Sequence, residues 1–509
     1  MKLNRTFMIN CKKVLKRIFQ LSLLFLITNV SVSCNQPKEE KNNDLTKAEK
    51  IEEIVSLYSE YEGFNGAVLV SHEGKVIFKK GFGFANLEWN IPNQTDTKFR
   101  IASITKPFTA MLIMQLVADG KLDLHEPIST YLPDYNKNNG DQITTHHLLS
   151  HTSGTARDYE SLLLKNKYPD RYRVNKIVQQ YSVLPLEFEP GEKFAYSNTG
   201  YHTLASIIET VSGKSYEALL QKNILNPLGM KNTGIDKHRT LIKNRAYGYF
   251  KGFGDYFNQD FGDMSAITGV GNIYSTVEDM FLLDQALYTE KILPKKYINL
   301  MFTKHISDPG YGGYYGYGWE FKEKPIGNTS ETVETIGHSG SMQGFTALFT
   351  RIPATNSSIV FFNNTGRAFL NAMTTAITGI INNESYDFPL KPLAMFMKKN
   401  IEKEGIEKGI LFYKEHKDLD DYYVSEQELI VAGYKYLQAE NAEYAAEIFK
   451  LSTEVFPDRD NPYDSYAEAL MTLGKNKKAI KNYKKSLELN PNNNNAVEML
   501  KKLGVENLK

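Results

Sequence analysis

The sequence predicts an α+β fold followed by an all-α segment, and three observations support this. Residues 50–390 begin and end with pairs of short runs rich in β-forming residues. Between these runs lie longer stretches with the three- and four-residue hydrophobic spacing of helices. From residue 395 to 509 the strand patterns disappear, and Lys, Glu, Ala, Leu and Tyr dominate. Strands at both ends of a domain, with helices between them, are typical of one mixed sheet built from the two ends.

The first 33 residues carry the pattern of a secretory signal peptide. Residues 1–17 contain six basic residues and no acidic one, and an uncharged, mostly apolar run of 15 residues follows, at 18–32. Such a run is too short to span a bilayer comfortably. It ends in Ser31-Val32-Ser33-Cys34, which resembles a bacterial lipoprotein cleavage site and implies a lipid on Cys34. A simple secreted protein or a signal anchor is the alternative.

Residues 34–49 are polar and are predicted to form a tether. We therefore expect export to the cell envelope, with a lipid anchor in a bacterial membrane and the protein facing the periplasm or the surface.

Composition argues against several classes of function. The 60 Lys and Arg residues nearly balance the 59 Asp and Glu residues, and a net charge of +1 removes the electrostatic basis for binding nucleic acid. The only cysteines are Cys11 and Cys34, so neither a disulfide framework nor a zinc–thiolate site is expected in the body of the protein. We expect no cofactor and no metal ion.

Two strand pairs mark the ends of the α+β region. Runs of β-forming residues at 66–71 and 75–80 flank the turn His72-Glu73-Gly74 and predict a hairpin. Residues 346–351 and 358–363 predict a second pair, linked through Pro353.

A buried amphipathic helix is predicted over residues 104–116, because apolar residues recur there every three or four positions before Asp119-Gly120 ends the pattern. Pro107 cannot donate a backbone hydrogen bond and fits best near a helix start, which places Ser103 at or close to that start.

Ser103-Ile104-Thr105-Lys106 is the only Ser-x-x-Lys in the chain. Residues three apart on a helix share one face, so a lysine made neutral by burial could take the proton of Ser103. The peptide N–H groups of the helix start could also stabilise an oxyanion. A solvated helix start would explain the motif equally well.

Two further segments carry residues of the same chemistry. Tyr196-Ser197-Asn198 follows the turn Phe188-Glu189-Pro190-Gly191 and precedes a helical run at 201–211. A phenol beside a lysine can act as general base or acid, and an amide can hold a substrate carbonyl or orient the lysine. His338-Ser339-Gly340-Ser341 precedes a predicted strand, and its small residues would let a substrate backbone lie against the strand edge.

These three elements, in this order, resemble the serine β-lactamase, penicillin-binding protein and esterase superfamily, in its class C-like branch. Flanking segments match as well, over roughly residues 50–390: Phe99-Arg100-Ile101-Ala102, Leu148-Leu149-Ser150-His151-Thr152-Ser153-Gly154 and Gly269-Val270-Gly271-Asn272-Ile273-Tyr274-Ser275-Thr276. The resemblance implies an antiparallel sheet flanked by helices, with a helical subdomain.

The resemblance also implies a mechanism. Ser103 attacks a carbonyl and forms an acyl-enzyme, while Lys106 and Tyr196 exchange the protons. The N–H groups of Ser103 and Ser341 hold the oxyanion. Asn198, His338 and Gly340 contact the substrate.

His338 departs from the β-lactamase pattern, which favours lysine there. Histidine is only partly charged at neutral pH, so it makes a weaker clamp for a β-lactam carboxylate, and we predict slow or absent β-lactam turnover.

The C-terminal segment resembles tetratricopeptide repeats. Ala445, Phe449 and Pro457 reappear 34 residues later as Ala479, Tyr483 and Pro491. A groove for a protein or peptide partner and a plain stabilising helical hairpin are both compatible with this pattern.

Two other clusters favour ordinary roles. His146, His147 and His151 have a spacing that could suit zinc, but they fall in or beside the Leu-Leu-Ser-His-Thr-Ser-Gly element, where packing and turn hydrogen bonds are expected. The Tyr- and Gly-rich residues 311–319 predict an aromatic strand beside the pocket.

The predicted function is an exported serine hydrolase. Expected substrates are peptides with D-residues, including cell-wall fragments, then carboxylic esters, and then β-lactams. An idle hydrolase fold that serves as a scaffold or sensor through its helical repeats is the alternative.

Overall fold

The computed structural model describes residues 45–505, except for residues 62, 159–173, 238, 253–254, 260–261, 311 and 367. The predicted signal peptide, the lipidation site Cys34 and most of the predicted tether lie outside the described residues. Within them, no helix combines the length and the apolar character needed to cross a membrane.

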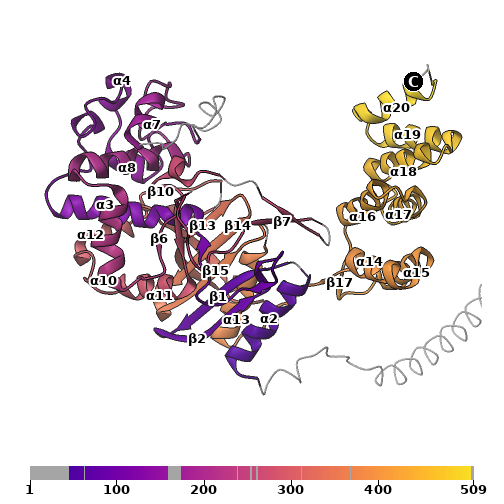
Figure 1. Ribbon diagram of the computed structural model, residues 1–509, viewed down its shortest axis with the longest axis horizontal. Helices are drawn as coiled ribbons and strands as arrows, with labels where there is room; N and C mark the ends of the chain where they lie inside the picture. The colour runs from indigo at the N-terminus through magenta and orange to yellow at the C-terminus, as the bar shows by residue number, and fades with distance from the viewer. Residues whose placement is uncertain are drawn as a thin grey trace, which may run out of the picture. The chain divides into compact units, whose positions relative to one another are not determined.

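An eight-stranded sheet forms the centre of the α+β region (Figure 1). Its strands, in spatial order, are β10 (Ile306–Ser307), β11 (Tyr314–Tyr315), β12 (Glu320–Pro325), β13 (Thr332–Met342), β14 (Phe345–Ile352), β15 (Ser357–Asn363), β1 (Gly66–His72) and β2 (Lys75–Phe82). All neighbours are antiparallel, as the family resemblance implies, so the mixed sheet expected from the strand pattern is wrong. Both predicted strand pairs are confirmed, and the pairing of β15 with β1 joins the two ends of the region as predicted.

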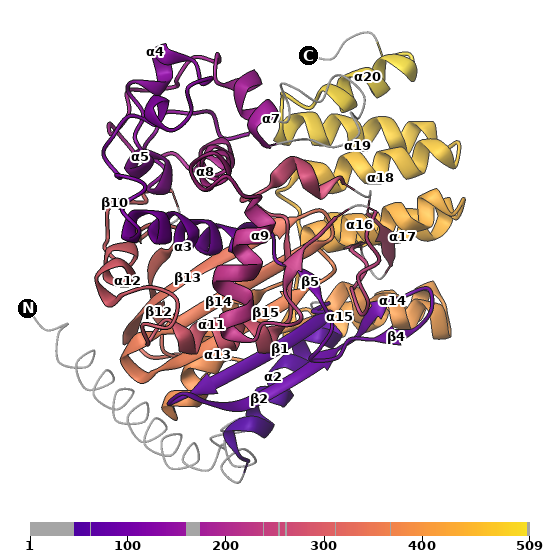
Figure 2. The same ribbon diagram turned by 60° about the vertical axis from the view of Figure 1, so that its left-hand side comes forward.

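Helices cover both faces of this sheet (Figure 2). The helices of the region are α2 (Lys47–Tyr61), α3 (Thr105–Ala118), α4 (Lys137–Gly140), α5 (Thr145–Leu149), α7 (Val174–Tyr181), α8 (Asn198–Ser212), α9 (Tyr216–Leu220), α10 (Asn226–Leu228), α11 (Val277–Ala286), α12 (Lys295–Met301) and α13 (Leu370–Asn382). α2 and α13 pack on one face, whereas α3, α8 and α11 belong to the core on the other. The α+β fold class is thus confirmed, with a helical layer inserted between the strand pairs.

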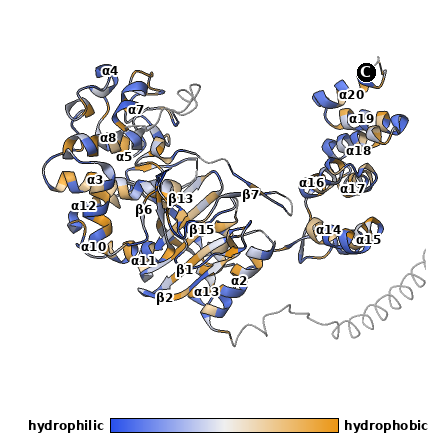
Figure 3. Ribbon diagram, in the orientation of Figure 1, coloured by the Kyte–Doolittle hydropathy of each residue, from blue (hydrophilic) through white to orange (hydrophobic). Residues whose placement is uncertain are grey.

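Alternation along β1 explains the two layers. Ala67 and Leu69 join the core that contains α3, whereas Val68 and Val70 join the core that contains α2 and α13. Successive side chains of a strand point to opposite faces, so a continuous apolar run is buried on both. Figure 3 accordingly colours the central strands largely as hydrophobic.

The helix that carries Lys106 differs from its prediction in one respect. α3 has the predicted position, but it is buried on almost every side, and Thr105, Lys106 and Thr109 are as buried as its apolar residues. A helix that lies between a sheet and a second helical layer has no solvent face, so the amphipathic expectation was wrong.

The C-terminal segment is helical, as its composition predicts. Its helices are α14 (Leu393–Glu404), α15 (Ile406–His416), α16 (Glu426–Gln438), α17 (Ala442–Val455), α18 (Asp460–Thr472), α19 (Asn476–Leu489) and α20 (Asn494–Lys502). Ala445, Phe449, Ala479 and Tyr483, which recur at the 34-residue period, are fully buried between these helices. Membership of the tetratricopeptide family and the predicted domain boundaries stay predictions.

Candidate active site

Ser103 lies in a single 3-10 turn, Ala102–Ile104, that leads directly into α3. Ala102 has a φ of 48°, in the left-handed region that favours glycine, and such a residue costs about 1–3 kcal/mol. The main chain on its N-terminal side is held by the short β5 (Phe99–Arg100), which pairs with β9 (Ile273–Ser275). Ser103 lies at the start of the helix, as predicted, and it is half-buried there.

Lys106 is fully buried and directed at Ser103. Its Nζ lies 3.2 Å from the Ser103 Oγ, 2.8 Å from the Asn198 Oδ1 and 3.3 Å from the Val270 carbonyl oxygen. Burial lowers the pKa of Lys106 to about 7, although the carboxylates of Asp158 and Glu320 raise it. A large fraction of this amine is therefore neutral near pH 7 and able to accept a proton.

Asn198 connects Lys106 to a carboxylate. It is the first residue of α8, whose N-cap Ser197 accepts a hydrogen bond from the Gly200 N–H. The Asn198 Oδ1 accepts from Lys106, and its Nδ2 donates to the Asp158 Oδ1 at 2.6 Å. Of the two roles considered for this amide, orienting the lysine is the one that these contacts display.

Tyr196 lies on the other side of the lysine. The Lys106 Nζ is 4.8 Å from the centre of the Tyr196 ring, and the Tyr196 hydroxyl hydrogen-bonds with Ser103. Burial raises the pKa of Tyr196 well above 10, and the hydrogen bond with Ser103 only partly opposes the rise. The phenol therefore keeps its proton at neutral pH, which suits a proton donor and shuttle better than a free base.

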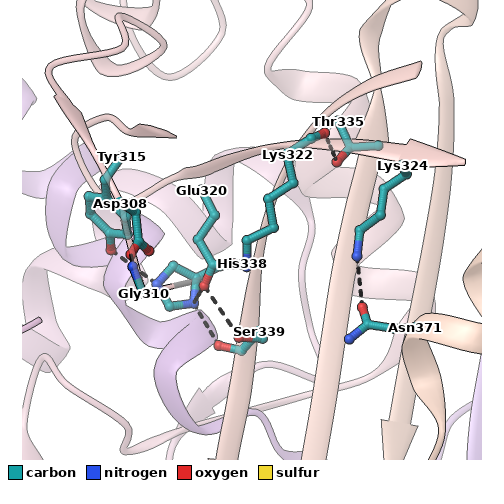
Figure 4. Close-up of polar contacts among 10 residues, drawn as sticks. All are labelled: Asp308, Gly310, Tyr315, Glu320, Lys322, Lys324, Thr335, His338, Ser339 and Asn371. Carbon is teal, nitrogen blue, oxygen red and sulfur yellow. Dashed lines mark hydrogen bonds and ion pairs between the residues drawn. The ribbon is translucent and has the colours of Figure 1, made fainter. Parts of the chain in front are cut away.

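His338 is buried in strand β13 with both ring nitrogens engaged by the protein (Figure 4). Its Nδ1 lies 2.6 Å from the Ser339 carbonyl oxygen, and its Nε2 lies 3.0 Å from the Tyr315 hydroxyl. Burial lowers the pKa of His338 to about 4, despite the nearby carboxylate of Glu320. Its predicted role as a substrate contact stays a prediction, but this ring is uncharged at neutral pH.

Glu320 is a site residue that the sequence did not indicate. Its Oε1 lies 3.7 Å from the His338 Nδ1 and 3.3 Å from the Ser339 Oγ, and its other oxygen pairs with Lys322 (Figure 4). The positive charges of Lys322 and, when protonated, His338 lower the pKa of Glu320 against the effect of burial. A carboxylate is therefore maintained beside the strand along which a substrate is expected to lie.

Gly340 lies in β13, and its predicted contact with a substrate stays a prediction. A Cβ at Gly340 would lie 2.2 Å from the Ile101 carbonyl oxygen, so the glycine allows β13 to approach the turn that carries Ser103. This close approach brings Ser341, the next residue along β13, to the same cavity as Ser103.

The cavity beside Ser103 has a volume of about 360 Å³. It is lined by Ala102, Ser103, Asp158, Asn198, Ile267, Val270, Gly271, Ser341, Met342 and Gln343. Ser103, Asn198 and Ser341 come from the three motifs of the sequence. Asp158 was missed because it sits in a loop without a readable motif.

The remaining candidates take ordinary places. No group of three or more possible metal-ligating side chains occurs among the described residues. His151 packs behind Tyr196, whereas His146 lies among His125, His147 and His305. In the aromatic run, Tyr315, Tyr317 and Trp319 are buried, and the Tyr315 hydroxyl lies beside His338.

The comparisons with known proteins agree with this arrangement. The Beta-lactamase family model matches residues 51–378. Penicillin-binding protein 4* of Bacillus subtilis (strain 168) is 29% identical over 363 residues, which cover 68% of this chain and 78% of that protein.

Solved structures of similar proteins have the same fold. A penicillin-binding protein from Bacillus halodurans is similar with a TM-score of 0.55 and 28% identity, over 64% of this chain and 98% of that one. The D-amino acid amidase from Ochrobactrum anthropi SV3, complexed with L-phenylalanine amide, gives a TM-score of 0.58 and 27% identity, over 66% and 99%. Lys106 contacts both Ser103 and the Tyr196 ring, and the chain belongs to the Beta-lactamase family, as a serine hydrolase fold related to penicillin-binding proteins.

Proposed function

We propose that this protein is an exported serine hydrolase that cleaves an amide or ester through an acyl-enzyme on Ser103. The observation that carries the proposal is the Lys106 amine, which is fully buried, has a pKa of about 7 and lies 3.2 Å from the Ser103 hydroxyl. At pH 7, a lysine with this pKa exists to about one half as a free amine, which a general base needs. A merely structural lysine gains nothing from such burial, because desolvation of its charge is unfavourable.

Acylation moves one proton and exchanges one bond. The Ser103 Oγ forms a bond to the substrate carbonyl carbon as its proton passes to the Lys106 Nζ, and the N–H groups of Ser103 and Ser341 stabilise the resulting oxyanion. Collapse of this intermediate breaks the bond to the leaving nitrogen or oxygen, which takes a proton from the Tyr196 hydroxyl. Lys106 then returns a proton to Tyr196, and water releases the acyl group by the reverse sequence.

The charges around the cavity support an amide or ester without a carboxylate beside the reacting bond. Asp158 and Glu320 both present carboxylates near Lys106, and His338 is neutral where a β-lactamase is expected to place a lysine. The permanent cations nearby, Arg157 and Lys322, already pair with Asp158 and Glu320, so a substrate carboxylate at that position would have to compete with them.

Peptides that contain D-residues, including cell-wall fragments, are our first substrate class. The likeness to a D-amino acid amidase supports this choice. Carboxylic esters come second, and β-lactams, with slow turnover, third. A lipid on Cys34 would hold the enzyme at the cell envelope, which is where such fragments occur, and the helical segment 395–509 would offer a surface for a protein or peptide partner.

Intact-mass labelling of the detergent-solubilised, full-length protein tests the proposal. The protein is treated with a fluorophosphonate and, separately, with a penicillin, alongside Ser103→Ala and the control Ser307→Ala, which alters an exposed serine of β10. We expect a covalent mass increase on the parent and the Ser307 variant, and none on the Ser103 variant.

The penicillin adduct separates the substrate classes. A slowly decaying adduct supports a peptidase-like enzyme, whereas rapid hydrolysis of penicillin contradicts our order of substrates and makes the protein a β-lactamase. If neither probe labels the folded parent protein, the hydrolase proposal is wrong, and the scaffold function is left.

A further inference from the structure

His151 lies directly behind the catalytic phenol. Its side chain is fully buried, and its ring centre is 4.2 Å from that of Tyr196, with 32° between the ring planes. The residue has a φ of 58°, in the left-handed region where a residue with a side chain is uncommon. This conformation turns both its carbonyl group and its ring toward the segment that carries Tyr196.

Two hydrogen bonds fix that segment on either side of Tyr196. The Ala195 N–H donates to the His151 carbonyl oxygen at 2.9 Å, and the Ser197 N–H donates to the His151 Nδ1 at 3.0 Å. Because Nδ1 accepts this hydrogen bond, the proton of the neutral imidazole lies on Nε2. His151 thus contacts Tyr196 and both of its chain neighbours.

The surroundings keep this imidazole neutral. The rings of Tyr201, Tyr315 and Phe194 pack around it at centre distances of 4.9, 4.7 and 5.8 Å. Burial lowers the pKa of His151 well below 6.5, and the nearby Lys106, His338 and Arg157 lower it further. A protonated ring would carry an N–H at Nδ1 and could no longer accept from Ser197.

The second ring nitrogen makes this histidine an unusual choice for simple packing. In the part of the chain that the structure describes, the buried Nε2 has no hydrogen-bond partner. An unsatisfied buried donor costs about 1–3 kcal/mol. An apolar side chain would pack here without that cost, but it could not accept from the Ser197 N–H.

We propose that His151 is a positioning residue for the reaction. Its Nδ1 and its ring hold Tyr196 in place, so that the Tyr196 hydroxyl stays beside Ser103. This inference rests on the proposed function, in which Tyr196 carries the proton to the leaving group. A displacement of about 1 Å in such a group can cost about 100-fold in rate, so an anchor on both sides of Tyr196 has a direct effect on turnover.

Two amide variants separate the anchor from general packing. His151→Asn keeps an acceptor near the place of Nδ1, and asparagine tolerates the left-handed backbone. His151→Gln has the same functional group one bond further out, so the acceptor for Ser197 is lost. His202→Gln makes the same change in a fully buried histidine of α8 whose ring lies 6.3 Å from that of Tyr181, and is the matched control.

The measurement is the rate of phosphonylation of the solubilised full-length protein, resolved into the apparent affinity for the fluorophosphonate and the maximal rate, from pH 6 to 9. We expect His151→Gln to lower the maximal rate by about 30- to 100-fold with little change in affinity, and His151→Asn to restore it to within about fivefold of the parent. His202→Gln should leave the rate within about twofold.

Amide hydrogen exchange of peptides that contain residues 195–197 gives a readout that needs no activity. Faster exchange at the Ser197 N–H in His151→Gln than in His151→Asn supports the anchor. Equal exchange in both variants, or equal maximal rates in both, overturns it. Failure of the parent protein to react with the probe would instead contradict the proposed function, and the exchange data would still decide whether His151 holds the segment.

Discussion

Removal of the Asp158 carboxylate should make the catalytic base function at lower pH. Asp158→Asn keeps the shape of the side chain and an oxygen that can accept from Asn198, but it removes the negative charge. That charge stabilises protonated Lys106 and raises its pKa, against the stronger effect of burial. The variant should therefore have a lower lysine pKa and a larger fraction of free amine below pH 7.

The structure sets the size of this effect. Hydrogen bonds of 2.6 and 2.8 Å link the Asp158 Oδ1 through the Asn198 amide to the Lys106 Nζ, so the charges lie no more than about 8 Å apart. At that distance the attraction is about 0.5 kcal/mol in water and about 2 kcal/mol at an effective dielectric constant near 20. Because 48% of the Asp158 side chain is exposed, we expect an attraction in the lower half of that range. Its loss would lower the pKa of Lys106, and with it the acidic limb of the pH–rate profile, by about 0.4 to 1 pH unit.

The assay is the second-order rate of fluorophosphonate labelling between pH 5 and 9. From a limb near pH 7 in the parent, the variant should gain about two- to fivefold in rate at pH 6 and little above pH 8. Asp119→Asn is the control, because its carboxylate pairs with Lys121 at the exposed end of α3. An acidic limb that stays in place or moves upward in Asp158→Asn would refute the assignment of Lys106 as the base.

Two further substitutions test the parts of the site that the fold holds in place. Lys106→Met should stabilise the protein. The pKa of Lys106 is about 7 in the folded state and 10.5 in the unfolded chain, so burying the charged amine destabilises the fold. This destabilisation is greatest below pH 7 and disappears as the pH rises toward 10.5. The gain in the free energy of unfolding has an upper limit of about 5 kcal/mol at pH 6, and urea unfolding that shows the same gain at pH 6 and pH 10 would contradict this. Gly340→Ala should destabilise the protein by about 1–3 kcal/mol and slow labelling of Ser103, since the new Cβ would lie 2.2 Å from the Ile101 carbonyl oxygen. Gly262→Ala, where no atom lies within 4 Å of the new Cβ, is the control, and equal thermal stabilities and labelling rates of the two glycine variants would count against this explanation.

Local patterns in the sequence were sufficient to predict the strand pairs and the position of Ser103 at a helix start. The hairpin at β1 and β2 follows from β-forming residues on both sides of a tight turn, and Ser103 lies at a helix start because Pro107 and the apolar spacing require one nearby. Both signals depend on neighbours within a few residues. Such signals do not depend on the tertiary fold, so they can be recognised without knowing which segments of the chain contact one another.

The burial of α3 on all sides could not be predicted from such local patterns. Apolar spacing predicted one buried face, but the helix is enclosed by the sheet on one side and by α8 on the other. Burial on all sides is what removes water from Lys106 and lowers its pKa. No feature of the segment around Lys106 could have revealed that, since it depends on residues 92 to 164 positions away, such as Asn198 and Val270.

The two carboxylates of the site could likewise not be predicted from local sequence patterns. Asp158 and Glu320 are ordinary acidic residues in a loop and a strand, with no spacing that relates them to Ser103. The pairing of β12 with β13 brings Glu320 beside His338, and a hydrogen bond from the first residue of α8 holds Asp158 near Lys106. By itself, the sequence determined which reactive groups are available, a serine, a lysine and a tyrosine in three recognisable segments. Only the tertiary structure decided their protonation states, because a pKa depends on which charges lie within a few ångströms and on how much water is excluded.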